Sequence, residues 1–202
     1  MKKYKIVLGA AFLPLAVLVY WGWVTVRGGF SARDRPSAVE AFVARNARAM
    51  AVPSSDRNRK NPYAATPENL RAGLEHFADH CAVCHANNGS GDTLFGRNMY
   101  PKPPDLRGAR SQRMSDGEIF YIIRNGVRLS GMPAFGEGQG ADDADTWKLV
   151  LFIRHLPALT PAQEKEMEQY NPKSAEEREE EKQEQEFLRG ENPRGKTRHP
   201  HH

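Results

Sequence analysis

The chain has 202 residues, of which 39% are hydrophobic and 27% are charged, so it can form one domain of ordinary size with extra segments but not two full cores. Its net charge of +4 is unevenly divided: residues 1–60 carry 11 basic and 3 acidic side chains, 61–160 carry 10 and 11, 161–188 carry 4 and 10, and 189–202 carry 4 and 1. This alternation argues against a nucleic-acid-binding surface, on which basic side chains converge on one folded face.

The N-terminal segment is predicted to be a transmembrane anchor. Residues 6–26 contain no charged side chain, and as a helix these 21 residues would span about 31 Å, enough to cross a bilayer. A cleaved secretory signal is the alternative, but its apolar region is roughly 7 to 15 residues long and ends in small residues. Here the stretch ends in a tyrosine and two tryptophans, which suit a membrane interface. We therefore expect an anchor over residues 1–27, with Lys2, Lys3 and Lys5 in the cytoplasm.

A basic juxtamembrane linker is expected over residues 28–65, because its later part is polar and bounded by prolines. A compact domain is expected over residues 66–158. Its first helix starts where Thr66 can act as the cap and Pro67 as the first helical residue.

Two further helices are predicted in this domain. One begins at the capping box Ser115–Glu118 and ends at Gly126, and the other covers about residues 144–156, before Pro157. No alternating strand pattern lies between the helices. The fold class predicted is all-α, with three to five helices in the domain.

The stretch CAVCH, residues 81–85, contains the only two cysteines of the chain. A disulfide between Cys81 and Cys84 would close too small a loop to stabilise the fold much. A zinc site would need a second ligand pair at the usual spacing, and a thioredoxin-like pair would need a βαβ pattern; neither is present in the sequence. His85 follows directly, and Cys-x-x-Cys-His is the attachment motif for c-type haem. We therefore predict one covalent haem c, with His85 as an iron ligand.

The segment from Thr66 to Pro157 resembles class I cytochromes c. GMPAF, residues 131–135, resembles the distal-ligand loop of that family, and PKPPDL, residues 101–106, resembles the segment whose proline carbonyl accepts the imidazole N–H of the iron-bound histidine. The residues that resemble the crossing of the family's terminal helices are Gly73, Phe77, Trp147, Phe152 and Leu156.

This resemblance implies a haem iron ligated by histidine and methionine. Met132 is expected to supply the thioether opposite His85, which raises the reduction potential relative to a second imidazole. Met99 and Met114 are the alternatives.

The resemblance also implies further haem contacts. The carbonyl of Pro103 or Pro104 is expected to accept the His85 N–H, the alternative being that these prolines only stiffen the loop. Trp147 is expected to be a core residue first and a haem neighbour second. His76 and His80 are interpreted as ordinary surface or partly buried histidines.

The C-terminal segment, residues 159–202, is expected to be a charged tail, because it has too few large apolar residues for a core of its own. A solvated helix is predicted over about residues 174–188. His199, His201 and His202 close the chain and could bind copper or another transition metal, the alternative being an expression remnant.

The function predicted from these features is single-electron transfer, not enzymatic catalysis. The protein would be tethered to the bacterial inner membrane with its haem domain in the periplasm, and its partners would be membrane-bound or periplasmic redox proteins. One alternative is a fixed haem subunit of a larger respiratory or dehydrogenase complex. Another is a gas sensor or enzyme in which Met132 is displaced from the iron.

Overall fold

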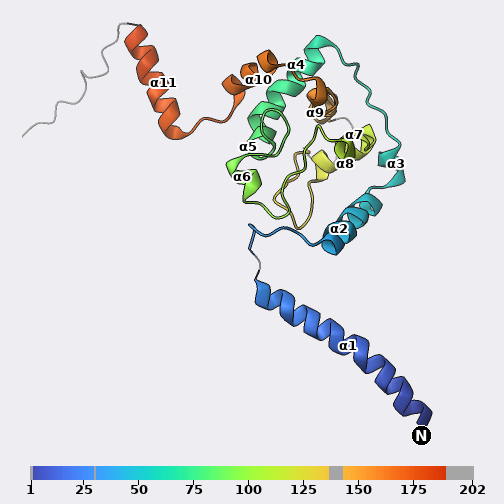
Figure 1. The fold of residues 1–202 in the computed structure, drawn as a ribbon. Coiled ribbons are helices and arrows are strands. Elements are labelled where there is room, and N and C mark those ends of the chain that lie inside the picture. Colours follow the sequence, from blue (N-terminus) through green and yellow to red (C-terminus); the bar gives the residue numbers. More distant parts are fainter. Residues whose placement is uncertain (1, 30, 137–142, 190–202) are drawn as a thin grey trace, which may run out of the picture.

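A computed structural model describes residues 2–29, 31–136 and 143–189, and within these ranges every regular element is a helix (Figure 1). The all-α class is therefore confirmed for the described residues. A π-helical turn, Phe77–Cys81, joins α4 to α5, and short 3-10 turns follow α9 and α10. The α-helices are α1 (Lys2–Gly28), α2 (Ala38–Ala51), α3 (Ser54–Arg57), α4 (Pro67–His76), α5 (Ala82–His85), α6 (Leu94–Arg97), α7 (Ala109–Gln112), α8 (Asp116–Asn125), α9 (Ala144–His155), α10 (Pro161–Met167) and α11 (Ala175–Leu188).

Helix α1 leads away from the compact region (Figure 1). Its large apolar side chains between Phe12 and Val26 are exposed. Among the described residues, no helix is both long enough and apolar enough to cross a membrane. The predicted transmembrane anchor is therefore not supported by the structure.

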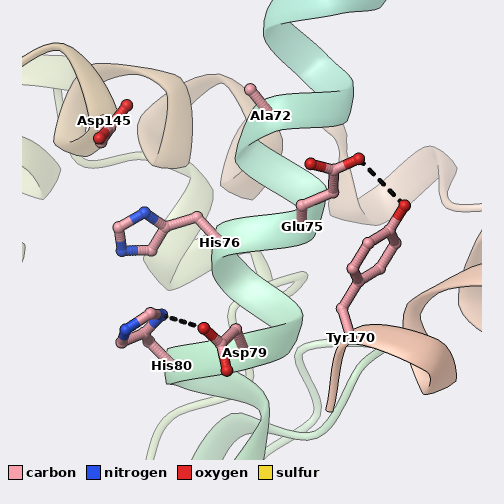
Figure 2. Close-up of a pocket in the computed structure, with 7 residues that line it drawn as sticks. All are labelled: Ala72, Glu75, His76, Asp79, His80, Asp145 and Tyr170. Carbon is pink, nitrogen blue, oxygen red and sulfur yellow. Dashed lines mark hydrogen bonds and ion pairs between the residues drawn. The ribbon is translucent and has the colours of Figure 1, made fainter. Parts of the chain in front are cut away.

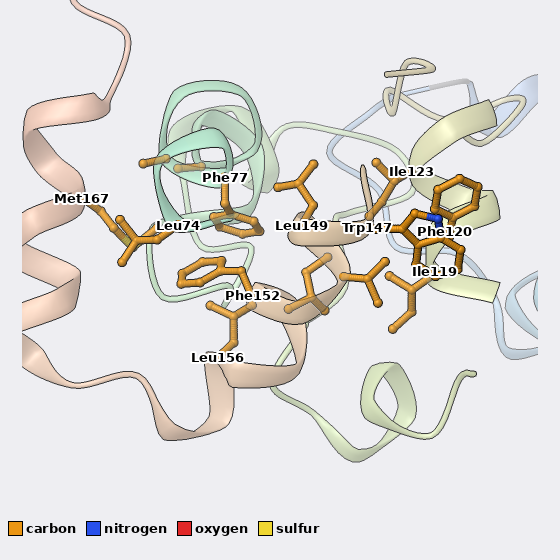
Figure 3. Close-up of a cluster of buried hydrophobic side chains, with 14 residues drawn as sticks. Leu74, Phe77, Ile119, Phe120, Ile123, Trp147, Leu149, Phe152, Leu156 and Met167 are labelled. Carbon is orange, nitrogen blue, oxygen red and sulfur yellow. The ribbon is translucent and has the colours of Figure 1, made fainter. Parts of the chain in front are cut away.

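The core is built on a close crossing of α4 and α9, seen among the buried side chains of Figure 3. A Cβ atom on Gly73 would lie 2.3 Å from the Lys148 carbonyl oxygen and 2.9 Å from Phe152 Cβ, so only glycine allows the helices to approach this closely. The rings of Phe77 and Phe152 lie beside this contact, with centroids 5.3 Å apart. The resemblance predicted that these residues meet, and the structure brings them together.

The predicted helix starts are confirmed. The Thr66 side chain accepts a hydrogen bond from the Asn69 N–H, and Ser115 and Glu118 form both bonds of a capping box. Each bond satisfies a backbone or side-chain polar group that the first turn would otherwise leave unpaired. Local sequence signals therefore position α4 and α8.

The residues before Thr66 pack against the domain, although the sequence placed them in a linker. Ser115 Oγ donates to the Arg57 carbonyl at 2.7 Å, and Asn61 Nδ2 donates to the Trp147 carbonyl at 2.9 Å. The Arg59 guanidinium lies 4.5 Å from the centroid of the Phe120 ring, a cation–π contact. The folded region thus begins earlier than residue 66.

The predicted tail also contributes to the core. Met167 on α10 is fully buried in the hydrophobic cluster, and Tyr170 donates a hydrogen bond to Glu75 on α4 at 3.0 Å. By contrast, α11 buries none of its residues, as expected of the predicted solvated helix, and it starts with a capping box at Ser174. His199, His201 and His202 lie outside the described residues.

The variant Gly73→Ala tests the helix crossing. Alanine favours a helix by about 1 kcal/mol over glycine, but the added methyl group would collide with backbone atoms of α9, and overpacking costs about 1–3 kcal/mol. We expect a lower free energy of unfolding in urea. The control is Gly28→Ala, whose Cβ would meet no atom within 4 Å and which should leave the free energy of unfolding of the domain unchanged. A Gly73→Ala variant as stable as the parent would contradict the close crossing.

Candidate functional site

The CAVCH motif lies where α4 ends and the helix widens into a π-turn. Cys81 is the last residue of this turn, and Cys84 and His85 lie on α5. Such π-turns inside helices are frequent at functional sites. The turn places both cysteines and the histidine within one short segment that directly follows the α4–α9 crossing.

Both cysteines are free, half-buried thiols. Burial, with a smaller effect from Cys84, raises the pKa of Cys81 to about 12, and burial also raises the pKa of Cys84. The thiols are therefore protonated near neutral pH, which disfavours a redox-active thiolate pair. Within the described ranges no group of three or more His, Cys, Asp or Glu side chains could hold a metal ion, so the zinc alternative finds no ligand set there.

His85 is a neutral imidazole facing a proline carbonyl. Burial lowers its pKa, and the Pro104 carbonyl partly opposes this shift. Its Nδ1 atom is buried and makes no hydrogen bond of ordinary geometry, although the Pro104 carbonyl is close enough to influence its pKa. The Pro103 carbonyl faces elsewhere, 2.8 Å from the position of a Cβ on Gly91. Of the two predicted prolines, Pro104 is thus the one beside the imidazole.

The loop after the motif brings Pro104 to this position by folding back over α5. The Gly91 N–H donates to the His85 carbonyl at 2.8 Å, and the Leu106 N–H donates to the Gly89 carbonyl at 2.8 Å. Gly89 and Gly91 both have positive φ angles, which side-chain-bearing residues rarely adopt. The first of these bonds holds the loop against the end of α5, and the second ties the part of the loop that carries Pro104 to the part that follows α5.

Met132 is held in a loop fastened to the end of α8. The Val127 N–H donates to the Met132 carbonyl at 3.1 Å, and the Phe135 N–H donates to the Ile123 carbonyl at 3.1 Å. Gly126, with a φ of 66°, comes so close that its Cβ would lie 2.6 Å from the carbonyl carbon of Pro133. The Met132 side chain itself is half-buried and packs against the core cluster.

The structure places the two competing methionines differently. The methyl group of Met99 occupies the space beside Gly131, 1.9 Å from the position of a Cβ there, so Met99 lies next to the Met132 loop. Met114 precedes α8, and its carbonyl accepts a hydrogen bond from Arg154 on α9. Sequence reasoning named Met99 as an alternative ligand but did not predict its contact with Gly131.

Trp147 is a core residue. It is 1% exposed, and its ring stacks on Phe120 with centroids 4.1 Å apart. Its indole Nε1 is buried and has no hydrogen-bond partner among the described residues. A buried N–H without an acceptor is costly. The two free thiols of the CAVCH motif and the Pro104 carbonyl beside the His85 imidazole fit a haem c, and the role of Trp147 as a haem neighbour stays a prediction.

Comparison with known proteins agrees with this chemistry. Residues 68–153, which are less than half of the chain, match the family model described as "Cytochrome C oxidase, cbb3-type, subunit III". A search of curated proteins finds none that matches the chain. The matched residues include the CAVCH motif, Pro104 and Met132, and the family implies haem c and haem-based electron transfer. Residues 68–153 therefore form a class I cytochrome c domain.

Proposed function

We propose that the domain transfers single electrons through one haem c that is covalently bound by Cys81 and Cys84. The observation that carries the proposal is the CAVCH motif on the π-turn and α5, with a neutral His85 whose buried Nδ1 lies near the Pro104 carbonyl. A neutral imidazole retains the lone pair that an iron ligand needs. The match of residues 68–153 to a cytochrome family supports the same conclusion.

The chain's own residues would each have a defined task. When bound, the haem supplies an iron that changes its oxidation state by one electron. The cysteine thiols would fix the group to the π-turn and α5, His85 would ligate its iron, and the Pro104 carbonyl would orient the imidazole by accepting its N–H. Met132 would provide a thioether on the other side.

The surrounding core supports this task by limiting access of water. Phe77 and Phe152 are almost fully buried beneath the motif, and Met132 packs against the same cluster. Burial and the identity of the axial ligand are two of the means by which a protein sets a haem potential. We propose that both favour a relatively high potential here.

We also propose that the domain lies on the outer side of the bacterial inner membrane, because c-type haem is attached there. An attachment to the membrane through α1 belongs to the same proposal. It is supported by the exposed apolar side chains from Phe12 to Val26, although no described helix has the length and apolarity of a membrane span.

A fixed subunit of a larger respiratory complex is the second candidate function. The description of the matching family names a subunit of an oxidase, and α11 offers a helix with no buried residue and many acidic side chains. Such a solvated helix is available for docking to a basic surface of a partner subunit.

Met132→Ala tests the iron ligation. The oxidised parent protein should show the weak far-red absorption band of methionine-bound haem and should not bind carbon monoxide. The variant should lose the band and bind carbon monoxide, because an axial position is then open. Met114→Ala is the matched control and should behave like the parent.

Met99→Ala decides between the two methionines at the distal loop. If Met132 is the ligand, this variant keeps the far-red band, and the loss of the side chain beside Gly131 changes only packing. Loss of the band in Met99→Ala together with its retention in Met132→Ala would contradict the proposed ligand.

Sizing of the gently extracted protein separates the two candidate functions. A free electron carrier should elute alone, whereas a fixed subunit should elute with partner chains in constant ratio. A matched chain that ends at residue 173, and so lacks α11, tests the docking helix: if α11 binds the partners, they should be lost while the haem spectrum stays the same. Retention of all partners by the shortened chain would contradict a docking role for α11.

A further inference from the structure

A second group of potential ligands lies on another face of α4 and the π-turn. Two histidines four residues apart, His76 and His80, present their rings to one open pocket with a volume of about 450 Å³ (Figure 2). Residues at this spacing lie on the same side of a helix, one turn apart. The residues that line the pocket are Ala72, Glu75, His76, Asp79, His80, Asp145 and Tyr170.

The two imidazole rings are spaced as they would be around one metal ion. Their centroids lie 4.6 Å apart, with 36° between the ring planes. Zn–N bonds of about 2.0–2.1 Å at a tetrahedral angle place the centres of two ligating imidazoles about 5 Å apart. The spacing of the rings is therefore compatible with both imidazoles binding one ion after rotation of their side chains.

Asp79 already orients one of these imidazoles. Its Oδ2 atom lies 3.2 Å from Nδ1 of His80, the contact drawn in Figure 2. A proton on Nδ1 that is held by a carboxylate leaves the lone pair on Nε2, the atom that would bind a metal. Metal-ligating histidines almost always have such a partner on their other nitrogen.

The other imidazole is held in its neutral form. Burial, and secondarily the neighbouring His80, lower the pKa of His76. The carboxylates of Asp145, Asp143 and Asp79 oppose this shift, so negative charge surrounds the ring. One of these carboxylate oxygens, Asp143 Oδ2, is buried and has no hydrogen-bond partner among the described residues. These carboxylates would partly neutralise the charge of a metal ion bound at His76.

Glu75 is less available than Asp145 as an additional ligand. Its carboxylate accepts hydrogen bonds from Arg71 and Tyr170, each at 3.0 Å. Among the described residues, the Asp145 carboxylate pairs with the Lys148 ammonium at 3.2 Å, and such exposed pairs are weak. Asp145, which already lines the pocket, can therefore exchange this pair for a bound ion at a low cost.

We propose that His76 and His80 form a binding site for a divalent transition-metal ion of the zinc or copper class. The two imidazoles supply the protein nitrogen ligands, and Asp145 or water supplies the rest, since no three suitable side chains of the described residues already stand at metal-binding spacing. Nitrogen donors with a carboxylate or water suit these ions better than calcium or magnesium. Neither histidine is among the proposed iron ligands, although His80 directly precedes Cys81 and its ring centroid lies 6.5 Å from that of Phe135 in the Met132 loop. The proposal changes the earlier interpretation of both histidines as ordinary ones.

Calorimetric titration with Zn²⁺ tests the site, because zinc does not exchange electrons with a haem. The parent is the full-length protein with His199, His201 and His202 all changed to alanine, which removes the other histidine cluster. This parent should bind one zinc ion. His76→Ala and His80→Ala should each weaken binding at least about 10-fold, and Asp79→Asn should weaken it about 10-fold through the loss of the orienting carboxylate.

His155→Ala is the matched control, because His155 also lies on a helix of the domain but contacts Gln163 outside the pocket. It should leave zinc affinity unchanged. The helical circular dichroism spectrum of each variant checks the fold, and His76→Gln and His80→Gln replace any alanine variant that does not fold. Absence of zinc binding by the parent, or equal affinity in the folded His76 and His80 variants, would overturn the proposal.

Discussion

The close crossing of α4 and α9 at Gly73 fixes the relative positions of the segments that are proposed to bind haem. Helix α4 continues directly into the π-turn and the CAVCH motif, so the position of His85 follows from where α4 packs. Helix α9 packs against α8, and the end of α8 fastens the Met132 loop. The distance between the two proposed axial ligands therefore depends on a contact that a single methyl group on Gly73 would disturb.

The parts of the site that are encoded in a short stretch of sequence could be predicted. The CAVCH motif consists of five consecutive residues. The helix starts at Thr66 and Ser115 depend on a side chain and a backbone group three residues away. The choice between Pro103 and Pro104 could not be predicted in the same way, because it depends on how the loop crosses Gly91. The contact of Met99 with Gly131 joins residues 32 positions apart, and no local pattern indicates it.

The extent of the folded region shows a second limit of sequence patterns. Val52 and Met167 are buried, although both lie in polar segments that have no apolar periodicity. A single apolar side chain finds its place only through tertiary packing, so these segments were predicted as linker and tail. The spacing of His76 and His80 was visible in the sequence, but the orienting contact of Asp79 and the shared pocket required the structure.

Covalent attachment of haem to the CAVCH motif is the central claim, and the intact mass of the denatured protein tests it most directly. The account predicts a mass that exceeds the polypeptide mass by one haem, and loss of this difference when Cys81 and Cys84 are both changed to alanine. A denatured protein with the mass of the polypeptide alone, after expression in cells that attach haem to other c-type cytochromes, would contradict it.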